Sequence, residues 1–308
     1  MNRHSTPLGL IAALVAATAC NTPAQKKEAE AAAAAADTLV MSQRASRIAA
    51  AIANDSTPAD KPVALWKLPA QLNEISGLAL TADGRLLTHQ DQRGKVFEVD
   101  YRRGVIVKEF SLGSPAVHGD FESITIADST IMLLTSNGLL YSFAEGKPDA
   151  VVPFKVRDTG LGVKCEFEGM TYEPASGNLL LACKHVHDAA LKDSVIIFRL
   201  PLEAPKDAKP RKIPYLAIPE KLIVGSNGWG DFRPSDITIN PVNGNYVIIA
   251  SREQAIAEVT PAGAVVFSRS LPSGHPQAEG VAITKDHILI ISDEAKGGPA
   301  LITMYRWP

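Results

Sequence analysis

The feature that most constrains the fold of this chain is a five-residue unit that recurs between residues 74 and 281. Each copy leads into an alternating strand, a turn and a second strand, and a polar loop then leads to a third strand. The copies are Glu74-Ile75-Ser76-Gly77-Leu78, Asp120-Phe121-Glu122-Ser123-Ile124, Glu166-Phe167-Glu168-Gly169-Met170, Arg233-Pro234-Ser235-Asp236-Ile237 and Gln277-Ala278-Glu279-Gly280-Val281. A strand unit that repeats in this way is typical of a β-propeller, in which each copy builds one blade.

The spacing of the copies gives the size of a blade. It is roughly 45 residues, the length of a four-stranded blade, apart from one longer interval between the third and fourth copies. In that interval the Pro- and Lys-rich segment 201–219 predicts an insertion on one rim. We therefore predict an all-β fold, a five-bladed β-propeller with four-stranded antiparallel blades.

The last copy lacks a fourth strand, because the chain after Leu301–Trp307 is too short to supply one. The apolar segment 63–68 precedes the first copy and is free to pair there. Closing the ring in this way removes an exposed sheet edge. We expect segment 63–68 to complete the last blade.

The N-terminal segment predicts export. Arg3 and His4 precede an apolar run over 8–19, which ends in small residues directly before Cys20. This pattern indicates a lipoprotein signal peptide over 1–19 with Cys20 as the acylated residue; ordinary cleavage with an incidental Cys is the alternative. Residues 20–61 then form a lipid-anchored, Ala-rich linker, and 62–308 the propeller. The expected location is the bacterial cell envelope, at the outer membrane or its periplasmic face, with the membrane as a partner.

Charge and motifs exclude several functions. The chain has 31 Lys and Arg against 33 Asp and Glu, a net charge of −2, so we expect no nucleic-acid partner. After the linker the sequence has no Gly-x-Ser-x-Gly, phosphate-binding loop, Cys-x-x-Cys or His-Glu-x-x-His. These absences argue against common hydrolase and nucleotide chemistries.

The third position of the repeat is the candidate site. The innermost strand of each blade lines the central channel, so equivalent residues form a ring at one mouth. The third positions of the copies are Ser76, Glu122, Glu168, Ser235 and Glu279. Three converging carboxylates repel one another unless a cation neutralises them, and hard oxygen ligands suit Ca²⁺.

Glu122, Glu168 and Glu279 are therefore the leading metal ligands, with Asp236 and Glu74 next. Ca²⁺ is the expected cofactor, and no catalytic residue is assigned. The alternative is that these carboxylates bond backbone amides of the neighbouring blade.

Two other groups of residues stay open. Cys165 and Cys183 form either a disulfide or two buried thiols, and a simple hairpin leaves them about three residues out of register. His185, His187 and Asp188 suit a transition metal or a base, but a solvated loop is the preferred interpretation.

The repeat with its flanking residues resembles the SdiA-regulated family of bacterial envelope propellers, which is distantly similar to NHL-repeat propellers. The resemblance rests on the first copy with Asp83-Gly84, on Gly119-Asp120-Phe121-Glu122 with Asn137-Gly138, on the third copy with Leu179–Lys184, and on the fifth copy with Ala282-Ile283. It implies a five-bladed propeller with a calcium site, a signal or anchor segment and no established catalytic activity. Ser123, in place of the usual Gly, and Asp91-Gln92, in place of an acidic pair, depart from the pattern.

Taken together, these features predict an envelope lipoprotein with a calcium-binding propeller, a non-enzymatic binding or scaffold module for an unknown protein or saccharide. The alternative is a metal-dependent hydrolase of lactonase or phosphoesterase type, with its site at the channel mouth. Whether the chain is an enzyme is left open, with the preference for a non-enzyme.

Overall fold

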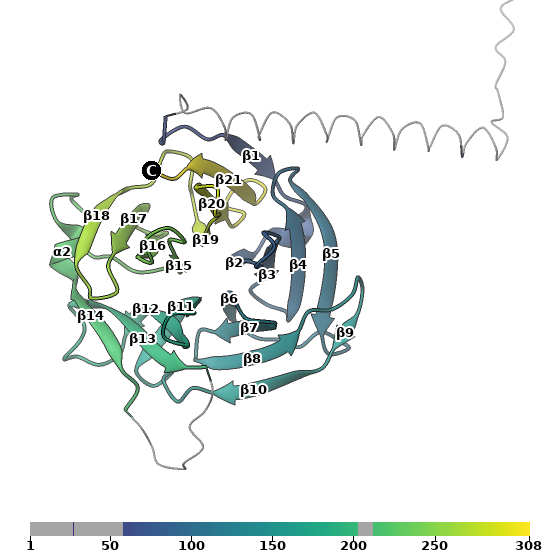
Figure 1. Ribbon diagram of the computed structural model, residues 1–308, viewed down its shortest axis with the longest axis horizontal. Coiled ribbons are helices and arrows are strands. Elements are labelled where there is room, and N and C mark those ends of the chain that lie inside the picture. The colour runs from purple at the N-terminus through teal and green to yellow at the C-terminus, as the bar shows by residue number, and fades with distance from the viewer. Residues whose placement is uncertain (1–26, 28–57, 203–211) are drawn as a thin grey trace, which may run out of the picture. The chain divides into compact units, whose positions relative to one another are not determined.

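The computed structural model describes residue 27 and residues 58–202 and 212–308. Residues 58–308 outside the gap form five sheets arranged in a ring around a centre (Figure 1). The predicted signal peptide, Cys20 and nearly all of the linker lie outside the described residues. Within the described part of the chain, no helix has the length and apolar character needed to cross a membrane.

Each sheet is one blade, and its strands run from the centre outward. Blade 1 contains β2 (Ile75–Leu80), β3 (Leu86–Gln90), β4 (Lys95–Asp100), β5 (Val105–Leu112) and the two-residue β9 (Val151–Val152). Blade 2 contains β6 (Phe121–Ala127), β7 (Thr130–Thr135), β8 (Leu139–Ala144) and β10 (Phe154–Asp158). Blade 3 contains β11 (Cys165–Glu173), β12 (Asn178–Val186), β13 (Ser194–Pro201) and β14 (Tyr215–Pro219). Blade 4 contains β15 (Asp236–Ile239), β16 (Tyr246–Ala250), β17 (Ala255–Val259) and β18 (Val265–Ser270).

Blade 5 contains β19 (Ala278–Ile283), β20 (Ile288–Asp293), β21 (Leu301–Arg306) and β1 (Ala64–Lys67). A 3₁₀ turn, η1 (Ala70–Leu72), and a short helix, α2 (Glu220–Val224), join the strands. The five-bladed propeller with antiparallel four-stranded blades is confirmed; β9 adds a short parallel strand to blade 1. Segment 201–219 is not only an insertion, because its end forms β14, the outer strand of blade 3.

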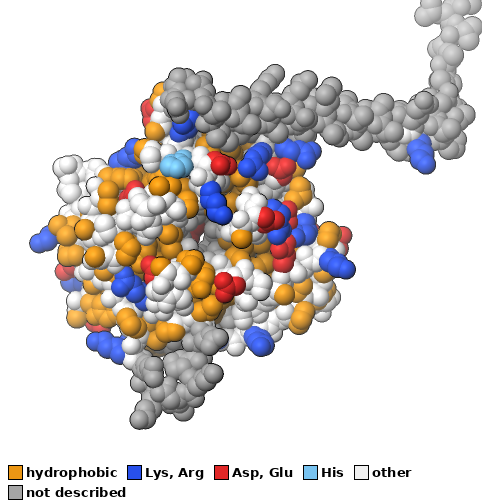
Figure 2. Space-filling model, viewed as in Figure 1, with side chains coloured by type: hydrophobic (Ala, Val, Ile, Leu, Met, Phe, Trp, Pro, Cys, Tyr) orange, Lys and Arg blue, Asp and Glu red, His pale blue; other side chains and the backbone are white. Residues whose placement is uncertain are grey.

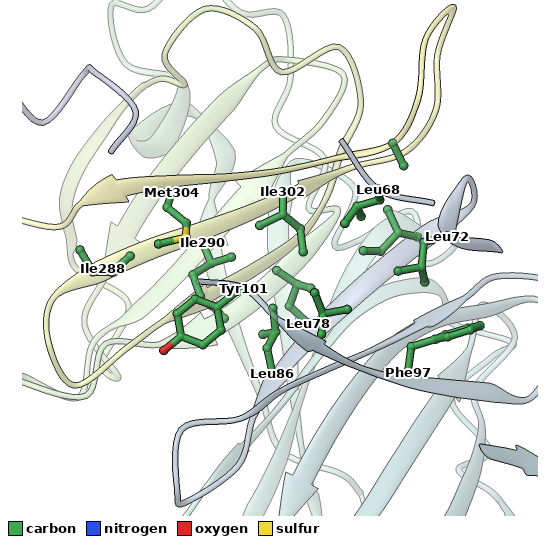
Figure 3. Packing of buried hydrophobic residues seen from close by; sticks show 14 residues of the cluster. Leu68, Leu72, Leu78, Leu86, Phe97, Tyr101, Ile288, Ile290, Ile302 and Met304 are labelled. Atoms are coloured by element: carbon green, nitrogen blue, oxygen red, sulfur yellow. The ribbon is translucent and has the colours of Figure 1, made fainter. Parts of the chain in front are cut away.

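The ring closes as expected. β1 pairs antiparallel with β21, from Ala64 opposite Met304 to Lys67 opposite Leu301. Behind this pairing, Leu68 and Leu72 are buried together with side chains of blades 1 and 5, among them Leu78 and Ile302 (Figure 3). Burying apolar surface from both sides of the seam stabilises closure beyond the strand hydrogen bonds.

The inner strands approach one another closely, and this explains the glycine at the fourth position of three copies. A Cβ added to Gly77 would lie 2.9 Å from Ile124 N of blade 2, and one on Gly169 would lie 2.9 Å from Ile237 N of blade 4. On Gly280 it would lie 2.5 Å from Ser76 O of blade 1. Only glycine allows backbones of neighbouring blades to come this near.

The other two copies have Ser123 and Asp236 at this position, and these side chains connect blades. Ser123 Oγ accepts a hydrogen bond from Met170 N at 2.8 Å and donates one to Asp236 Oδ1 at 3.2 Å. Asp236 Oδ2 accepts a third, at 2.8 Å, from Val281 N of blade 5. Burial raises the pKa of Asp236, while the donated backbone and hydroxyl hydrogen bonds oppose that rise. The departure at Ser123 therefore has a structural role.

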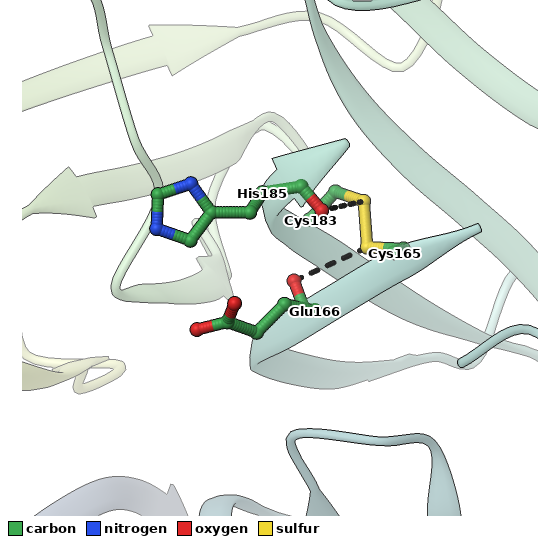
Figure 4. Close-up of a disulfide and its surroundings, with 4 residues drawn as sticks. All are labelled: Cys165, Glu166, Cys183 and His185. Carbon is green, nitrogen blue, oxygen red and sulfur yellow. Dashed lines mark hydrogen bonds between the residues drawn. A yellow bond between two sulfur atoms is a disulfide. The ribbon is translucent and has the colours of Figure 1, made fainter. Parts of the chain in front are cut away.

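Cys165 and Cys183 form a disulfide between β11 and β12, with their Cα atoms 5.7 Å apart (Figure 4). The simple hairpin register still applies at Cys165, which pairs with Val186, because the two shifts on either side of Phe167 cancel. Each shift is a β-bulge, and bulges bend and twist the strands, so the two cysteines meet although they do not lie opposite each other in the ladder.

Candidate functional site

The three glutamates of the repeat lie at β-bulges, which sequence reasoning did not foresee. In the pairing of β6 with β7, Phe121 and Ser123 have partners and Glu122 is the extra residue. Glu168 is the extra residue between Phe167 and Gly169, and Glu279 between Ala278 and Gly280. A bulge redirects the side chain of its extra residue, so the same local irregularity sets the direction of all three carboxyl groups.

Lys184 joins this group from a bulge of its own. It lies between two residues of β12, Cys183 and His185, that pair with adjacent residues of β11. Its Nζ lies 2.5 Å from Glu168 Oε1, and the side chain of Glu168 is only 6% exposed. Glu168 also shares a side-chain hydrogen bond with Glu122. The centre of the site is thus a carboxyl pair with one ammonium group.

The pKa values of the three glutamates are higher than that of a free glutamate. Burial, followed by the charges of Glu168 and Asp120, raises the pKa of Glu122 to about 9. Burial and the charge of Glu168 raise the pKa of Glu279 to about 8. Burial also raises the pKa of Glu168, although Lys184 works against that rise. At neutral pH Glu122 and Glu279 therefore hold protons, and the charge of Lys184 favours the anion at Glu168.

Lys184 keeps its positive charge although its side chain is partly buried. Burial acts to lower the pKa of Lys184, but the net shift is upward, mainly because of the charge of Glu168 and its hydrogen bond to Lys184. A charged lysine among neutral and anionic carboxyls keeps the net charge of the site small.

The other third-position residues tie blades together. Ser76 Oγ donates to the backbone oxygen of Glu122 at 2.8 Å, and Ser235 Oγ donates to that of Ala278 at 2.7 Å. Asp236 is 1% exposed and committed to the hydrogen bonds between blades described above. The alternative role, a carboxylate that bonds amides of a neighbouring blade, is therefore found at Asp236.

Glu74 belongs to a second acidic group on blades 1 and 5. Its Oε1 accepts a hydrogen bond from Gln92 Nε2 at 2.7 Å. Burial, and then Glu74, raises the pKa of Asp91 to about 7, and burial and Glu74 also raise that of Glu294. Of the five predicted metal ligands, Glu122, Glu168 and Glu279 thus act on one another electrostatically. Asp236 is committed to hydrogen bonds between blades, and Glu74 belongs to the second acidic group.

A pocket of about 450 Å³ opens beside Glu279. Its wall includes Lys184, Ser235, Ser251 and Arg233, of which only Ser235 belongs to the predicted ring. Ser251 shares a side-chain hydrogen bond with Glu279. Ser251 follows the second strand of its copy, as Asp91 and Glu294 do in theirs, and Lys184 lies near the end of β12, the second strand of blade 3. This common position near the end of the second strand was the available sequence signal.

The predicted His185 loop is partly strand. His185 lies in β12, and its Nδ1 is 2.7 Å from Arg233 Nη1. Burial, and then the charge of Arg233, lowers the pKa of His185 against the opposing effect of Glu166. Asp188 accepts a hydrogen bond from Ala190 N at 3.0 Å, as expected of a turn residue. His185 is therefore a neutral partner of an arginine.

This arrangement does not fit a calcium site. Lys184 provides the positive charge that the carboxylates were expected to take from a metal, and an ammonium group cannot coordinate one. Among the described residues, no group of three or more His, Cys, Asp or Glu side chains is arranged to hold a metal ion. Ca²⁺ stays a sequence-based prediction, and no step below is derived through it.

The raised carboxyl pKa values predict that the protein loses stability as the pH rises. In the unfolded chain these glutamates titrate near pH 4.5, whereas Glu122 titrates at about 9 in the folded protein. Between these pH values the folded state binds more protons than the unfolded state. The stabilisation that these protons give is therefore complete below about pH 4.5 and is lost as the pH increases through the pKa of the folded state. The slope is at most about 1.4 kcal/mol per pH unit for each such group.

We expect the thermal midpoint to fall between about pH 5 and pH 9 and the Glu122→Gln variant to show a flatter dependence. Thermal unfolding followed by circular dichroism at each pH measures both. Glu109→Gln removes a carboxylate of β5 that pairs with Lys95 of β4 in blade 1 and should retain the wild-type slope. An equal slope in Glu122→Gln and the wild type would contradict the raised pKa.

Comparisons with known proteins support the fold. The glutaminyl cyclase of Myxococcus xanthus has a TM-score of 0.51 at 14% identity, over 79% of this chain and 94% of its own. The PQQ-bound aldose sugar dehydrogenase of Streptomyces coelicolor has a TM-score of 0.51 at 15% identity, over 81% and 99%. A luciferin-regenerating enzyme has a TM-score of 0.51 at 11% identity, over 80% and 95%. No family model and no curated protein matches the chain.

These names correct the functional prediction. The three proteins named above are enzymes by name, which contradicts the preferred reading of a non-enzymatic binding or scaffold module and favours the enzyme alternative. Identities of this size establish the fold alone, so any activity has to be argued from the residues of this chain. The chain is a five-bladed β-propeller whose channel mouth carries three glutamates and a lysine.

Proposed function

We propose that this propeller is a lactonase, an enzyme that hydrolyses a lactone ring, with the glutamates of the channel mouth as its general acid and base. The observation that supports it most is Glu279, a carboxyl group on the wall of a 450 Å³ pocket with a pKa of about 8. A carboxyl group that stays protonated near neutral pH is suited to donate a proton to a leaving oxygen. Perturbed carboxyl groups beside a pocket are typical of catalytic sites.

The base in this proposal is the pair of Glu122 and Glu168. The two carboxyl groups share a hydrogen bond, so the pair holds one proton and one negative charge, and Lys184 stabilises the charge. Glu122 is the half-buried member and Glu168 the buried one. The pair therefore titrates as one acceptor, and its more exposed carboxyl exchanges protons with water in the mouth.

The proposed reaction balances without any further reactant. The oxygen of a water molecule bonds to the ester carbonyl carbon while the pair takes one proton of that water. The bond between this carbon and the ring oxygen breaks, and Glu279 gives its proton to that oxygen. The products are a hydroxyl group and a carboxylic acid on one open chain. One proton then returns from the pair to Glu279, which restores the resting state.

The pH dependence of hydrolysis tests this proposal. With the uncharged lactone dihydrocoumarin as probe, we expect kcat/KM to decline above about pH 8, because Glu279 loses its proton there. At acid pH it should decline again, because the pair takes up a second proton. Absorbance assays across the pH range measure both limbs. Hydrolysis that is no faster with the wild type than with Glu168→Gln at any pH would overturn the proposal.

We also propose, from the N-terminal pattern and the resemblance to the SdiA-regulated family, that the chain is exported and anchored through Cys20. An anchored hydrolase would act on molecules of the cell envelope, and a protein or saccharide partner there stays a prediction. Cys20→Ala is expected to move the protein from the detergent-soluble membrane fraction to the soluble fraction, as measured by immunoblot after fractionation. Equal partitioning of the two forms would contradict the lipid anchor.

A further inference from the structure

The pocket beside Glu279 has a strongly basic wall. Its cationic side chains come from blades 3, 4 and 5 and are Lys184, Arg233, Arg252 and Lys296, and Glu279 is the one carboxyl group among the described residues that line it. Figure 2 shows basic and acidic side chains near the central hollow of the face in view. Because the pKa of Glu279 is about 8, this carboxyl group is largely uncharged at neutral pH and does not offset the cations.

Arg233 is held in position by two neighbours. Its Nε donates to Asp231 Oδ2 at 2.9 Å, and its Nη1 donates to His185 Nδ1 at 2.7 Å. The acceptor nitrogen of His185 carries no proton in this arrangement, which agrees with the lowered pKa of that ring. A guanidinium group fixed on one side keeps its remaining donors in a defined direction, as selective binding of an anion requires.

Arg252 is the more accessible of the two arginines. Its side chain is 67% exposed, and its Nη1 lies 3.5 Å from the same Asp231 oxygen that accepts from Arg233. Asp231 lines an adjoining pocket of about 220 Å³, which shares Lys184, His185 and Arg233 with this one, and does not line the larger pocket itself. Two guanidinium groups thus border the larger pocket while the carboxylate they share lies outside its wall.

We infer that this pocket is a subsite for an anionic group of the substrate, a carboxylate or a phosphate, bound by Arg233, Arg252 and Lys296. The inference rests on the proposed function, because the ester to be cleaved would lie next to Glu279 in the same pocket. Guanidinium groups bind both anions through paired, charge-assisted hydrogen bonds. A volume of about 450 Å³ suits a small molecule, so the substrate class is a small lactone or ester with an anionic substituent.

Direct binding tests the subsite without any need for turnover. Inorganic phosphate and acetate are titrated separately into the wild type and into Arg252→Gln/Lys296→Gln, at constant ionic strength, by isothermal titration calorimetry. We expect the double substitution to weaken binding of at least one anion by about tenfold or more. The anion that loses more affinity identifies the preferred group. Lys147→Gln removes an exposed cation outside the pocket and should bind as the wild type does.

The outcomes separate the two proposals. If the double variant binds both anions as tightly as the wild type, or if neither anion binds the wild type, the subsite is refuted. If the anions bind as expected but no lactone is hydrolysed, the subsite stands and the proposed function fails. If hydrolysis occurs, an anionic lactone should lose about tenfold more kcat/KM than dihydrocoumarin in the double variant. Equal losses would refute the subsite and leave the proposed function intact.

Discussion

Replacement of Glu279 by glutamine is expected to lower kcat/KM for dihydrocoumarin at pH 7 by about 10²- to 10⁴-fold, the usual contribution of a positioned general acid. Glutamine has nearly the same shape, but its amide does not release a proton to the leaving oxygen. The variant should also lose the decline above pH 8, because that limb reports the titration of Glu279. Initial rates across the pH range measure both effects.

A matched comparison separates this loss from a loss of structure. Glu109→Gln lies on β5 and removes one carboxylate of a half-exposed ion pair with Lys95, so it should retain the wild-type rate. Glu279→Gln should melt no lower than the wild type at pH 8.5, because the carboxylate that it removes is a buried charge at that pH. Retention of the wild-type rate and of its alkaline limb in Glu279→Gln would refute the assignment of this acid.

Gly280→Ala is expected to destabilise the propeller by about 3 kcal/mol or more. This is the upper end of the usual cost of placing too large a side chain in a packed site. The added Cβ would lie 2.3 Å from Ser292 Oγ, 2.5 Å from Ser76 O and 2.8 Å from Leu78 Cγ. The Ser76 oxygen belongs to the inner strand of blade 1 and is fixed by the ring, so relief requires blades 1 and 5 to separate. The midpoint of urea unfolding should decrease accordingly.

Gly230→Ala is the control for this substitution. A Cβ at Gly230 would meet nothing within 4 Å, and its φ lies outside the positive range that favours glycine. Its midpoint should therefore stay close to that of the wild type. Equal midpoints for Gly280→Ala and Gly230→Ala would show that the inner strands are not packed as described.

The number of blades could be predicted from the sequence because it equals the number of copies of the repeat. The ring closure could be predicted because the last copy lacks one strand. The inner strand of every blade carries the same unit, and only the fifth copy lacks an outer strand, which β1 supplies. The convergence of Glu122, Glu168 and Glu279 could be anticipated for the same reason. These residues hold the same position in their copies, so they come close together once the blades form a ring.

The chemistry of the site could not be predicted in the same way. A bulge depends on the pairing of single residues across two strands, so neither the redirection of Glu168 nor that of Lys184 is visible in the repeat. Lys184 lies outside the five-residue unit, and without it the glutamates predict a metal. The disulfide between Cys165 and Cys183 could not be predicted either, because Cys165 pairs with Val186 and the two cysteines meet only where bulges at Glu168 and Lys184 distort the strands.

The pairing of β1 with β21 has a consequence for how the protein folds. It joins Ala64 to Met304, so the contact spans the four other blades and part of the fifth. Contacts between residues so far apart in sequence form slowly, whereas each inner hairpin depends on neighbouring residues. Blades 1 to 4 can therefore assemble while the seam is still open. Until it closes, β21 has a free edge, and an incompletely folded molecule can pair there with a second chain instead of with its own β1.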